Sequence, residues 1–431
     1  MGGIYIHVPF CTSHCVYCGF YSELLPRHSS DCVCDNNRAR LEDYVYALCT
    51  EIRNTERYDI ADTLYIGGGT PSVLGIAQIR KIVTELNGKF QLRLKEFTIE
   101  VNPDDIVRGG KDYAAGLRSL GVTRVSMGIQ SFDDAVLKRM GRRHNAVQAI
   151  QAYAILREAG FDNISLDFIF GFTDHFDVRE WEKQLNALPG GLPEHISCYQ
   201  LSIEDGSGLE KMISRGIFAV PADEVCEKQY YDICAALSNL GYEHYEISNW
   251  ARRASASDSL PVSPSSLSPQ SPYRSRHNSA YWNHTPYTGF GPGAHSLLVS
   301  PGESADSDAR GQTAMMRRWN NPDVKAYIAA AGLLNGASGT AEDFSSVRGS
   351  ETLTPGQIRE ERIMLGLRTS DGIEEEWLKR NVKEERITEF LGRGFLCRIA
   401  GRDENKSGNP GYIRIPESRW FVSDSIISDL I

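Results

Sequence analysis

Short runs of β-branched residues alternate with longer segments of helical periodicity from the N-terminus to about residue 250. This alternation is typical of repeated βα units, in which helices cover the faces of a parallel sheet. The sequence predicts strands at Ile4–Val8, Thr63–Ile66, Phe97–Val101, Arg124–Gly128, Ile164–Phe170 and Ile196–Leu201. It predicts helices near Leu41–Asn54, Ile76–Leu86, Tyr113–Leu120, Asn145–Ala159, Trp181–Leu188 and Ala222–Leu240. Six such units predict an α/β fold built as an open or partial barrel over residues 1–250.

The remainder of the chain divides where its composition changes. Residues 251–276 contain the run ASASDSLPVSPSSLSPQSP, which is rich in Ser and Pro and predicts a disordered insertion. A second loop is expected at Ser300–Gln312. We expect residues 277–345 to close the barrel, and residues 346–431, whose helical segments precede the ribbon GYIRI, to form a small helical domain of winged-helix-like form.

Composition excludes several classes of protein. A formal net charge of −10 argues against nucleic-acid binding, which needs clustered Lys and Arg. No run approaches the roughly 18–20 consecutive apolar residues of a membrane span, and the start MGGIYIHVPFC lacks the pattern of a secretion signal. We therefore expect a cytoplasmic protein whose 10 cysteines are thiols or metal ligands rather than disulfides.

Three cysteines, Cys11, Cys15 and Cys18, follow the first predicted strand with the spacing C-x3-C-x2-C. Thiolates are soft ligands that suit iron–sulfur clusters and zinc. Zinc would need a fourth ligand, for which His7 or His14 is available, but no second ligand pair follows at the usual spacing. A [4Fe–4S] cluster on three thiolates leaves one iron open to a further ligand.

Two more cysteines, Cys32 and Cys34, form C-x-C in a loop rich in Ser, Asp and Asn, and they are additional candidate ligands. Gly67–Pro71 follow the second predicted strand, where glycines allow the backbone to approach a ligand or simply make a tight turn. Polar residues at or after the later strands, Glu100, Gln130, Arg142 and Asp167, are candidate ligand contacts. Taken alone, each is equally explained as a capped or solvated polar side chain.

A last motif, His277-Asn278-x-x-Tyr281-Trp282, places an imidazole near two aromatic rings. Such a group suits a haem iron and the flat macrocycle around it. The alternative interpretation is that His277 and Asn278 cap a turn while Tyr281 and Trp282 pack in the core.

The run YIHVPFCTSHCVYCGFYS is similar to the signature of radical S-adenosylmethionine enzymes, in the branch of oxygen-independent coproporphyrinogen III oxidase-like proteins that includes HemW haem chaperones. The similarity continues through GGGTP, VNP, GIQSF, GRRH, LDFIFG, EISNWAR, the HNxxYW motif and GFGPGAHS. It implies a partial (β/α)6 TIM-like barrel and a [4Fe–4S] cluster on the three cysteines, with S-adenosylmethionine on its open iron. It assigns cofactor contacts to Tyr5, Gly68, Gly69, Thr70, Glu100, Gln130, Arg142, Asp167 and Ala294.

Phe20 stands where coproporphyrinogen dehydrogenases carry a further cysteine, which favours the chaperones. The resemblance then implies a protein that binds haem through His277, Asn278, Tyr281 and Trp282 and delivers it to an apo-haemoprotein. A ferredoxin or flavodoxin is the expected electron donor, contact with a membrane is expected only through the acceptor, and a homodimer is left open. The alternatives are a radical enzyme acting on a tetrapyrrole such as coproporphyrinogen III, and a cluster-bearing scaffold without haem or S-adenosylmethionine.

Overall fold

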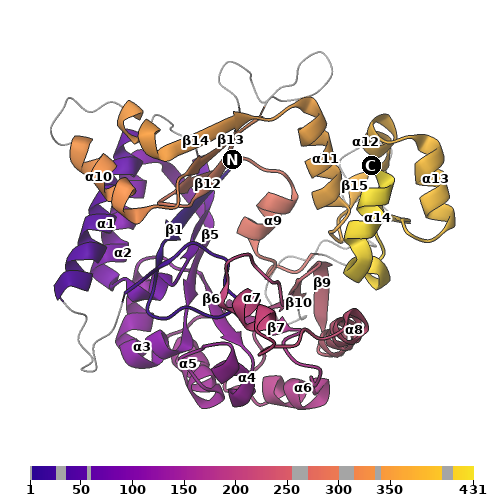
Figure 1. Cartoon of the computed structure of the whole chain (residues 1–431), viewed down its shortest axis with the longest axis horizontal. Coiled ribbons are helices and arrows are strands. Elements are labelled where there is room, and N and C mark those ends of the chain that lie inside the picture. Colours follow the sequence, from indigo (N-terminus) through magenta and orange to yellow (C-terminus); the bar gives the residue numbers. More distant parts are fainter. Residues whose placement is uncertain are drawn as a thin grey trace.

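The computed structural model describes residues 2–25, 35–55, 60–254, 270–299, 315–334, 341–399 and 411–431. Its centre is a 12-stranded sheet with the order β14-β13-β12-β11-β1-β4-β5-β6-β7-β8-β10-β9 (Figure 1). The six central strands are β1 (Gly2–Val8), β4 (Ile60–Gly68), β5 (Gln91–Val101), β6 (Arg124–Gln130), β7 (Ile164–Phe170) and β8 (His195–Gln200). They are parallel to one another and correspond to the six predicted strands. The prediction of an α/β fold with six βα units is therefore confirmed.

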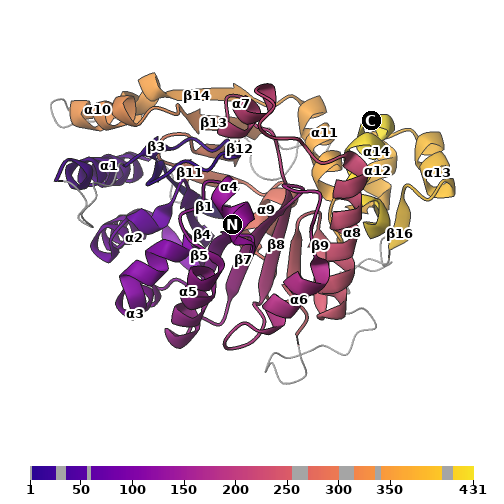
Figure 2. The same ribbon diagram turned by 60° about the horizontal axis from the view of Figure 1, so that its bottom comes forward.

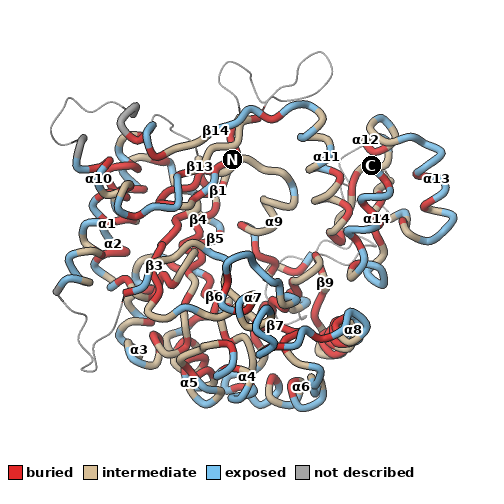
Figure 3. Tube along the Cα trace, viewed as in Figure 1, coloured by how far each residue is buried: buried red, intermediate tan, exposed pale blue. Residues whose placement is uncertain are grey.

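Helices cover the outer face of this sheet, and the strands form the buried centre (Figures 2 and 3). They are α1 (Asp35–Asn54), α2 (Ile76–Lys89), α3 (Pro103–Ser119), α5 (Ala146–Glu158), α6 (Val178–Asn186) and α8 (Asp223–Asn239). In α2, Ile79, Ile82 and Leu86 are buried at helical spacing. The helix α3 begins well before the predicted Tyr113, because Pro103 directly after Asn102 suits the first position of a helix. Two short helices, α4 (Asp134–Arg139) and α7 (Gly208–Ser214), lie in the loops after β6 and β8.

Strands from the second half of the chain extend the sheet at both edges. On one side, β11 (Tyr287–Phe290) pairs in parallel with β1, and β12 (His295–Val299), β13 (Met315–Asn320) and β14 (Arg348–Thr352) continue antiparallel. On the other side, β10 (Asn249–Arg252) and β9 (Tyr242–Glu246) follow β8. The buried carboxylate of Glu51 on α1 accepts hydrogen bonds from Asn320 (2.8 Å), Arg348 (2.6 Å) and Tyr327 (2.5 Å), the last on α10 (Val324–Leu334). The added strands are therefore anchored to the barrel.

The C-terminal part is a small unit of helices beside a three-stranded antiparallel sheet, at the right of Figure 1. Its elements are α11 (Pro355–Gly366), β15 (Ile373–Glu374), α12 (Glu375–Asn381), α13 (Glu384–Gly392), β16 (Cys397–Ile399), β17 (Tyr412–Arg414) and α14 (Ser423–Leu430). The predicted ribbon GYIRI contains β17, which lies between β15 and β16. Whether residues 346–431 form a separate domain of winged-helix-like form stays a prediction.

Several predicted features fall outside the described residues: Cys32, Cys34, most of the Ser/Pro-rich run and the loop Ser300–Gln312. Residues 251–276 were predicted to be a disordered insertion, but the parts of this range that the structure describes, 251–254 and 270–276, belong to the fold. Arg252 is the last residue of β10, and Arg274 forms ion pairs with Glu243 and, at 3.1 Å, with Asp371 in the C-terminal unit. Of the helices in the described ranges, none has the length and apolar character needed to cross a membrane.

Candidate cluster and cofactor site

A cavity of about 550 Å³ opens at the carboxyl ends of the central strands, where parallel α/β sheets usually bind their ligands. We call it the cluster cavity. Its wall contains most of the residues predicted for the cluster and cofactor, namely Cys11, Cys15, Cys18, Gly68, Gly69, Thr70, Glu100, Gln130, Arg142 and Asp167. These residues come from the segment after β1, from the end of β4 and the loop that follows it, from the strands β5, β6 and β7, and from the turn after α4. The fold thus brings together side chains that are far apart in the sequence.

The cysteine loop is held at both ends and at its middle. The short strands β2 (Phe10–Cys11) and β3 (Glu23–Leu24) pair with each other and bring the two ends of the loop together. At the middle, the Val16 N–H donates to the Met140 carbonyl at 3.0 Å, and the Val16 carbonyl accepts from the Leu209 N–H at 2.6 Å. The loop conformation is therefore fixed by hydrogen bonds to neighbouring elements.

The three thiols are unpaired and stand beside polar donors. Cys11 Sγ lies 3.3 Å from Thr70 Oγ1, and Arg142 Nη1 donates to Cys15 Sγ at 3.3 Å. Burial, together with the nearby thiols of Cys15 and Cys11, raises the pKa of Cys18 to about 11. A hydroxyl and a guanidinium that contact sulfur stabilise thiolates, which are the form that binds iron.

This donor set fits an iron–sulfur cluster better than zinc. Cysteine thiolates are the ligands that [4Fe–4S] clusters use. His7 is not free to be a fourth zinc ligand, because its Nδ1 is 3.0 Å from Tyr5 Oη and its Nε2 is 3.0 Å from the Tyr21 carbonyl. Within the described ranges, no three His, Cys, Asp or Glu side chains lie at the spacing that one metal ion would need.

Two glycines are required where the end of β4 meets the cysteine loop. Gly68 has φ of +111°, and a Cβ there would lie 2.8 Å from the imidazole of His7. A Cβ on Gly69 would lie 2.6 Å from the Phe10 carbonyl oxygen. Neither position has room for a side chain, so the backbone itself forms this part of the cavity wall.

Two carboxyl groups lie on the same wall. Glu100 accepts hydrogen bonds from Tyr65 Oη at 2.7 Å and from the Gly68 N–H at 3.1 Å. Asp167 accepts from Ser126 Oγ at 2.8 Å. Burial raises the pKa of Asp167 and raises that of Glu100 to about 7. Such carboxyls can accept hydrogen bonds from hydroxyl or ammonium groups of a ligand.

A chain of side-chain contacts joins two of the cysteines across the cavity. Thr70, which contacts Cys11, accepts from Asn102 Nδ2 at 3.3 Å. Asn102 Oδ1 in turn accepts from Arg142 Nη2 at 2.8 Å, and Arg142 contacts Cys15. Asn102 was not among the predicted site residues, although the motif VNP contains it. Gln130, at the other side, has φ of +69°, an uncommon conformation for a residue with a side chain.

The HNxxYW residues lie on the short helix α9 (Arg276–Trp282). Asn278 reaches the cavity wall, but His277 is only 2% exposed. Its Nδ1 lies 2.9 Å from Thr63 Oγ1 and its Nε2 lies 3.0 Å from Tyr281 Oη, while its ring stacks on Tyr65 with centroids 5.1 Å apart. Both ring nitrogens are therefore engaged inside the fold in this conformation. Trp282 is partly buried.

Two other predicted cofactor residues do not line the cavity. The hydroxyl of Tyr5 is directed to His7. Ala294 is 1% exposed in the glycine-rich turn, where its N–H donates to the Gly291 carbonyl at 3.1 Å. In this geometry neither residue reaches the cavity, so a contact between either residue and a cofactor stays a prediction.

The sequence model of the radical SAM superfamily matches residues 5–182 of this chain. This part contains the cysteine loop and the first five parallel strands. The fold is similar to that of coproporphyrinogen III oxidase (HemN) from Escherichia coli, a radical SAM enzyme, with a TM-score of 0.66 and 17% identity over 99% of this chain and 89% of that one. The fold and the three-cysteine cavity therefore define a radical S-adenosylmethionine protein.

Two relatives narrow this class. The heme chaperone HemW of Lactococcus lactis is 30% identical over 403 residues, which cover 91% of this chain and 90% of the relative. HemW of Bacillus subtilis is 30% identical over 399 residues, with 91% and 88% covered. The chain belongs to the HemW family.

Proposed function

We propose that this chain is a haem chaperone that binds haem and delivers it to apo-haemoproteins, and that it carries a [4Fe–4S] cluster with S-adenosylmethionine. The observation that carries the cluster assignment is the presence of Cys11, Cys15 and Cys18 on one cavity wall together with Glu100 and Asp167. The haem assignment is supported by the relatives, which are called heme chaperones, and by the HNxxYW motif next to the cavity.

In this proposal the three thiolates hold the cluster, and Arg142 and Thr70 donate to two of them. When bound, the cluster would supply one electron for cleavage of a sulfonium bond of S-adenosylmethionine. Glu100 and Asp167 accept hydrogen bonds from polar groups of the bound molecule, and the backbone at Gly68 approaches it closely.

Haem binding by His277 requires a change at α9. Because Thr63 and Tyr281 occupy both imidazole nitrogens, an iron can bind His277 only after one of these hydrogen bonds breaks. Burial lowers the pKa of His277 to about 3, so the buried imidazole is neutral and carries a lone pair of the kind that iron binds. We propose that α9 opens when haem is loaded, with Asn278, Tyr281 and Trp282 next to the macrocycle.

The proposed partners follow from this activity. An apo-haemoprotein accepts the haem, and a ferredoxin or flavodoxin reduces the cluster. We place the protein in the cytoplasm, where an exposed cluster with an open iron stays reduced, and contact with a membrane arises only through the acceptor. A homodimer would shield the cluster cavity.

Anaerobic haem titration tests the proposal. The full chain should give a shifted Soret band, and His277→Ala should weaken binding at least tenfold. His284→Ala is the matched control, because His284 lies on the same segment but pairs with Glu361 at 3.0 Å; it should bind haem like the wild type. Equal binding by His277→Ala and the wild type would contradict the assignment. Decarboxylation of coproporphyrinogen III with consumption of S-adenosylmethionine would show a radical enzyme instead.

A further inference from the structure

A chain of buried hydrogen bonds runs from the cluster cavity to the start of the helix α9. Ser165 Oγ donates to Asp167 Oδ1 at 3.0 Å and lies 2.8 Å from His195 Nδ1. His195 Nε2 lies 2.8 Å from Tyr245 Oη, which accepts from the Ser275 N–H at 3.3 Å. Ser275 is the residue that caps α9. We call these five residues the buried relay, and only Asp167 among them was predicted as a site residue.

The buried relay lies inside the protein except at its cavity end. Ser165, His195 and Ser275 are 0% exposed, and Tyr245 is 2% exposed. Asp167 is less buried and lines the cluster cavity. In a dry interior, hydrogen bonds are stronger than in water, and each bond of a chain polarises the next. A ligand in the cluster cavity can therefore act on the relay at Asp167.

Both ends fix the direction of the bonds in the relay, because the backbone N–H at the start of α9 can only donate and the carboxylate of Asp167 can only accept. Since Ser165 gives its hydrogen to Asp167, His195 Nδ1 carries the proton that Ser165 Oγ accepts. His195 Nε2 is then the acceptor for the Tyr245 hydroxyl. Burial and the nearby guanidinium of Arg124 lower the pKa of His195 well below its ordinary value, so the imidazole is neutral, with one donor and one acceptor nitrogen. Every bond therefore points from α9 toward the cavity.

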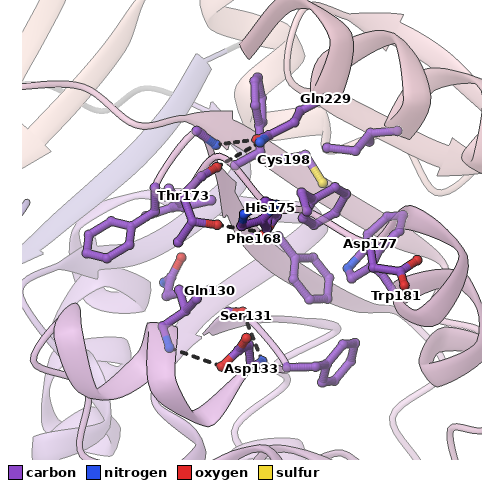
Figure 4. Close-up of a pocket in the computed structure, with 18 of the residues that line it drawn as sticks. Gln130, Ser131, Asp133, Phe168, Thr173, His175, Asp177, Trp181, Cys198 and Gln229 are labelled. Atoms are coloured by element: carbon purple, nitrogen blue, oxygen red, sulfur yellow. Dashed lines mark hydrogen bonds between the residues drawn. The ribbon is translucent and has the colours of Figure 1, made fainter. Parts of the chain in front are cut away.

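The strand β7 holds the cavity end of the relay in place. Ser165 and Asp167 are two residues apart, so they share one face of the strand. Phe168 points to the other face, into the pocket drawn in Figure 4, where its ring packs edge-on against Trp181 with centroids 5.3 Å apart. A change at Asp167 therefore passes to Ser165 through their hydrogen bond rather than through movement of the strand.

The other end of the relay holds the first turn of α9. Ser275 Oγ accepts from the Asn278 N–H at 3.3 Å, so the residue that contacts Tyr245 is also the cap of the helix. Glu96 on β5 holds the same turn by accepting from the His277 N–H at 3.0 Å. His277 is two residues after Ser275, and its release is the step that haem binding requires in the proposed function. A weaker bond at Ser275 therefore makes this release easier.

We propose that the buried relay couples the cluster cavity to α9, so that S-adenosylmethionine bound at Asp167 favours the opening of α9 for haem. This inference rests on the proposed function, in which a polar group of the cofactor donates to Asp167. Since coupling between two sites is reciprocal, haem should raise the affinity for the cofactor by the same factor.

The direction of the coupling follows from the charge at Asp167. Hydrogen bonds to an ionised carboxylate are stronger than those between neutral groups, and a second donor from the cofactor takes up part of the charge that Ser165 now uses. Because the bonds of a chain strengthen one another, a weaker bond at Asp167 also weakens the contact between Tyr245 and Ser275. The first turn of α9 is then held less firmly.

Hydrogen exchange followed by mass spectrometry tests the coupling on the anaerobically reconstituted full chain, with and without S-adenosylmethionine. The peptide of residues 274–282 should exchange about threefold faster with the cofactor. The electron paramagnetic resonance spectrum of the same preparation records whether the cofactor is bound. A changed spectrum with unchanged exchange would overturn the inference alone, and an unchanged spectrum would overturn the proposed function together with the inference.

Two tyrosine variants locate the coupling. Tyr245→Phe removes the hydroxyl in the middle of the relay and should abolish the effect of the cofactor on α9. Tyr230→Phe is the matched control, because Tyr230 is also 2% exposed and donates to the Ile247 carbonyl at 2.9 Å, outside the relay. It should respond to the cofactor like the wild type. Equal responses of the two variants would overturn the proposal.

A pair of serine variants tests the relay without any cofactor. Ser165→Ala removes the donor between His195 and Asp167 and should speed the exchange of residues 274–282 about threefold. Ser126→Ala removes a hydrogen bond of 2.8 Å to the other oxygen of the same carboxylate and should leave this exchange unchanged. Equal exchange in the two serine variants would overturn the proposal even where Tyr245→Phe fails to fold.

Discussion

The cluster cavity and the helix α9 carry the two sets of motif residues, and they differ in how accessible their ligand atoms are. In the cluster cavity, thiols and carboxyls line open space, and the surrounding hydrogen bonds hold them there. On α9, the polar atoms of His277 are used up by Thr63 and Tyr281. Under the proposed function, the cluster cavity can take its ligand as it stands, whereas α9 must open to bind haem. Motif residues predict which side chains come together, but their accessibility depends on neighbours from other elements.

The largest effect should come from removing one of the three thiols of the cluster cavity. Cys15→Ala should lose the cluster completely, from about four irons per chain to none after anaerobic reconstitution, because a cluster with only two thiolates is not retained. Iron and sulfide analysis measures this. Cys234→Ala, a partly buried cysteine on α8, is the control and should keep the wild-type iron content. If Cys15→Ala retained the cluster, Cys15 would not be a required ligand, and the contrast between the cluster cavity and α9 would fail.

The next effect tests whether the cavity wall is fixed by its glycines. Gly68→Ala should lower the free energy of unfolding by about 1–3 kcal/mol or more, because the φ of +111° is unfavourable for alanine and its Cβ would press on His7. Gly75→Ala should change little, since Gly75 has φ of −74° and its Cβ would meet only Gln78 at 3.9 Å. Denaturant unfolding of the two variants gives the difference between their free energies of unfolding. Equal values would mean that the cavity wall rearranges to accept a side chain at residue 68.

A smaller effect concerns Glu100 in the cavity without ligand. Its pKa is about 7 in the folded chain and 4.5 for an ordinary glutamate, so between these values the folded state holds a proton that the unfolded state has lost. The stability of the wild type should therefore fall as the pH rises through this window. Glu100→Gln cannot ionise and should be more stable than the wild type by about 1–3 kcal/mol at pH 8, with little difference at pH 4. Unfolding curves with a pH-independent difference would show that Glu100 is not buried as an acid.

The smallest effect tests the closed state of α9. Thr63→Val keeps the shape of the side chain but removes the hydrogen bond to His277 Nδ1, and so lowers the cost of releasing the imidazole. Haem affinity should rise about threefold to tenfold. An unchanged or weaker affinity in the Soret titration would mean that His277 stays in the core when haem binds.

Local sequence patterns were enough to predict the parallel sheet. The strand Ile164–Phe170 matches its prediction at both ends, because a strand covered on both faces is apolar along most of its length. The strand β5 begins earlier than predicted, at Gln91, because its first half alternates polar residues that are largely exposed. The strand β11 was missed, since Tyr287–Phe290 is short, rich in glycine nearby, and stabilised by pairing with β1 at the far end of the chain.

Most of the predicted site residues line the cluster cavity, but other contacts around it were not predictable from motifs. Asn102 connects Thr70 with Arg142 only because β4, β5 and the loop after α4 meet in space. The burial of His277 depends on Thr63, which lies in another strand and carries no motif signal.

The most direct test of the account is the electron paramagnetic resonance spectrum of the reduced, reconstituted chain before and after addition of S-adenosylmethionine. If Cys11, Cys15 and Cys18 hold a [4Fe–4S] cluster with one open iron, the molecule binds that iron and the cluster signal should change in shape and g-values. A cluster signal that stays the same with S-adenosylmethionine in excess would contradict the account, because it would mean that no iron is open to the cavity.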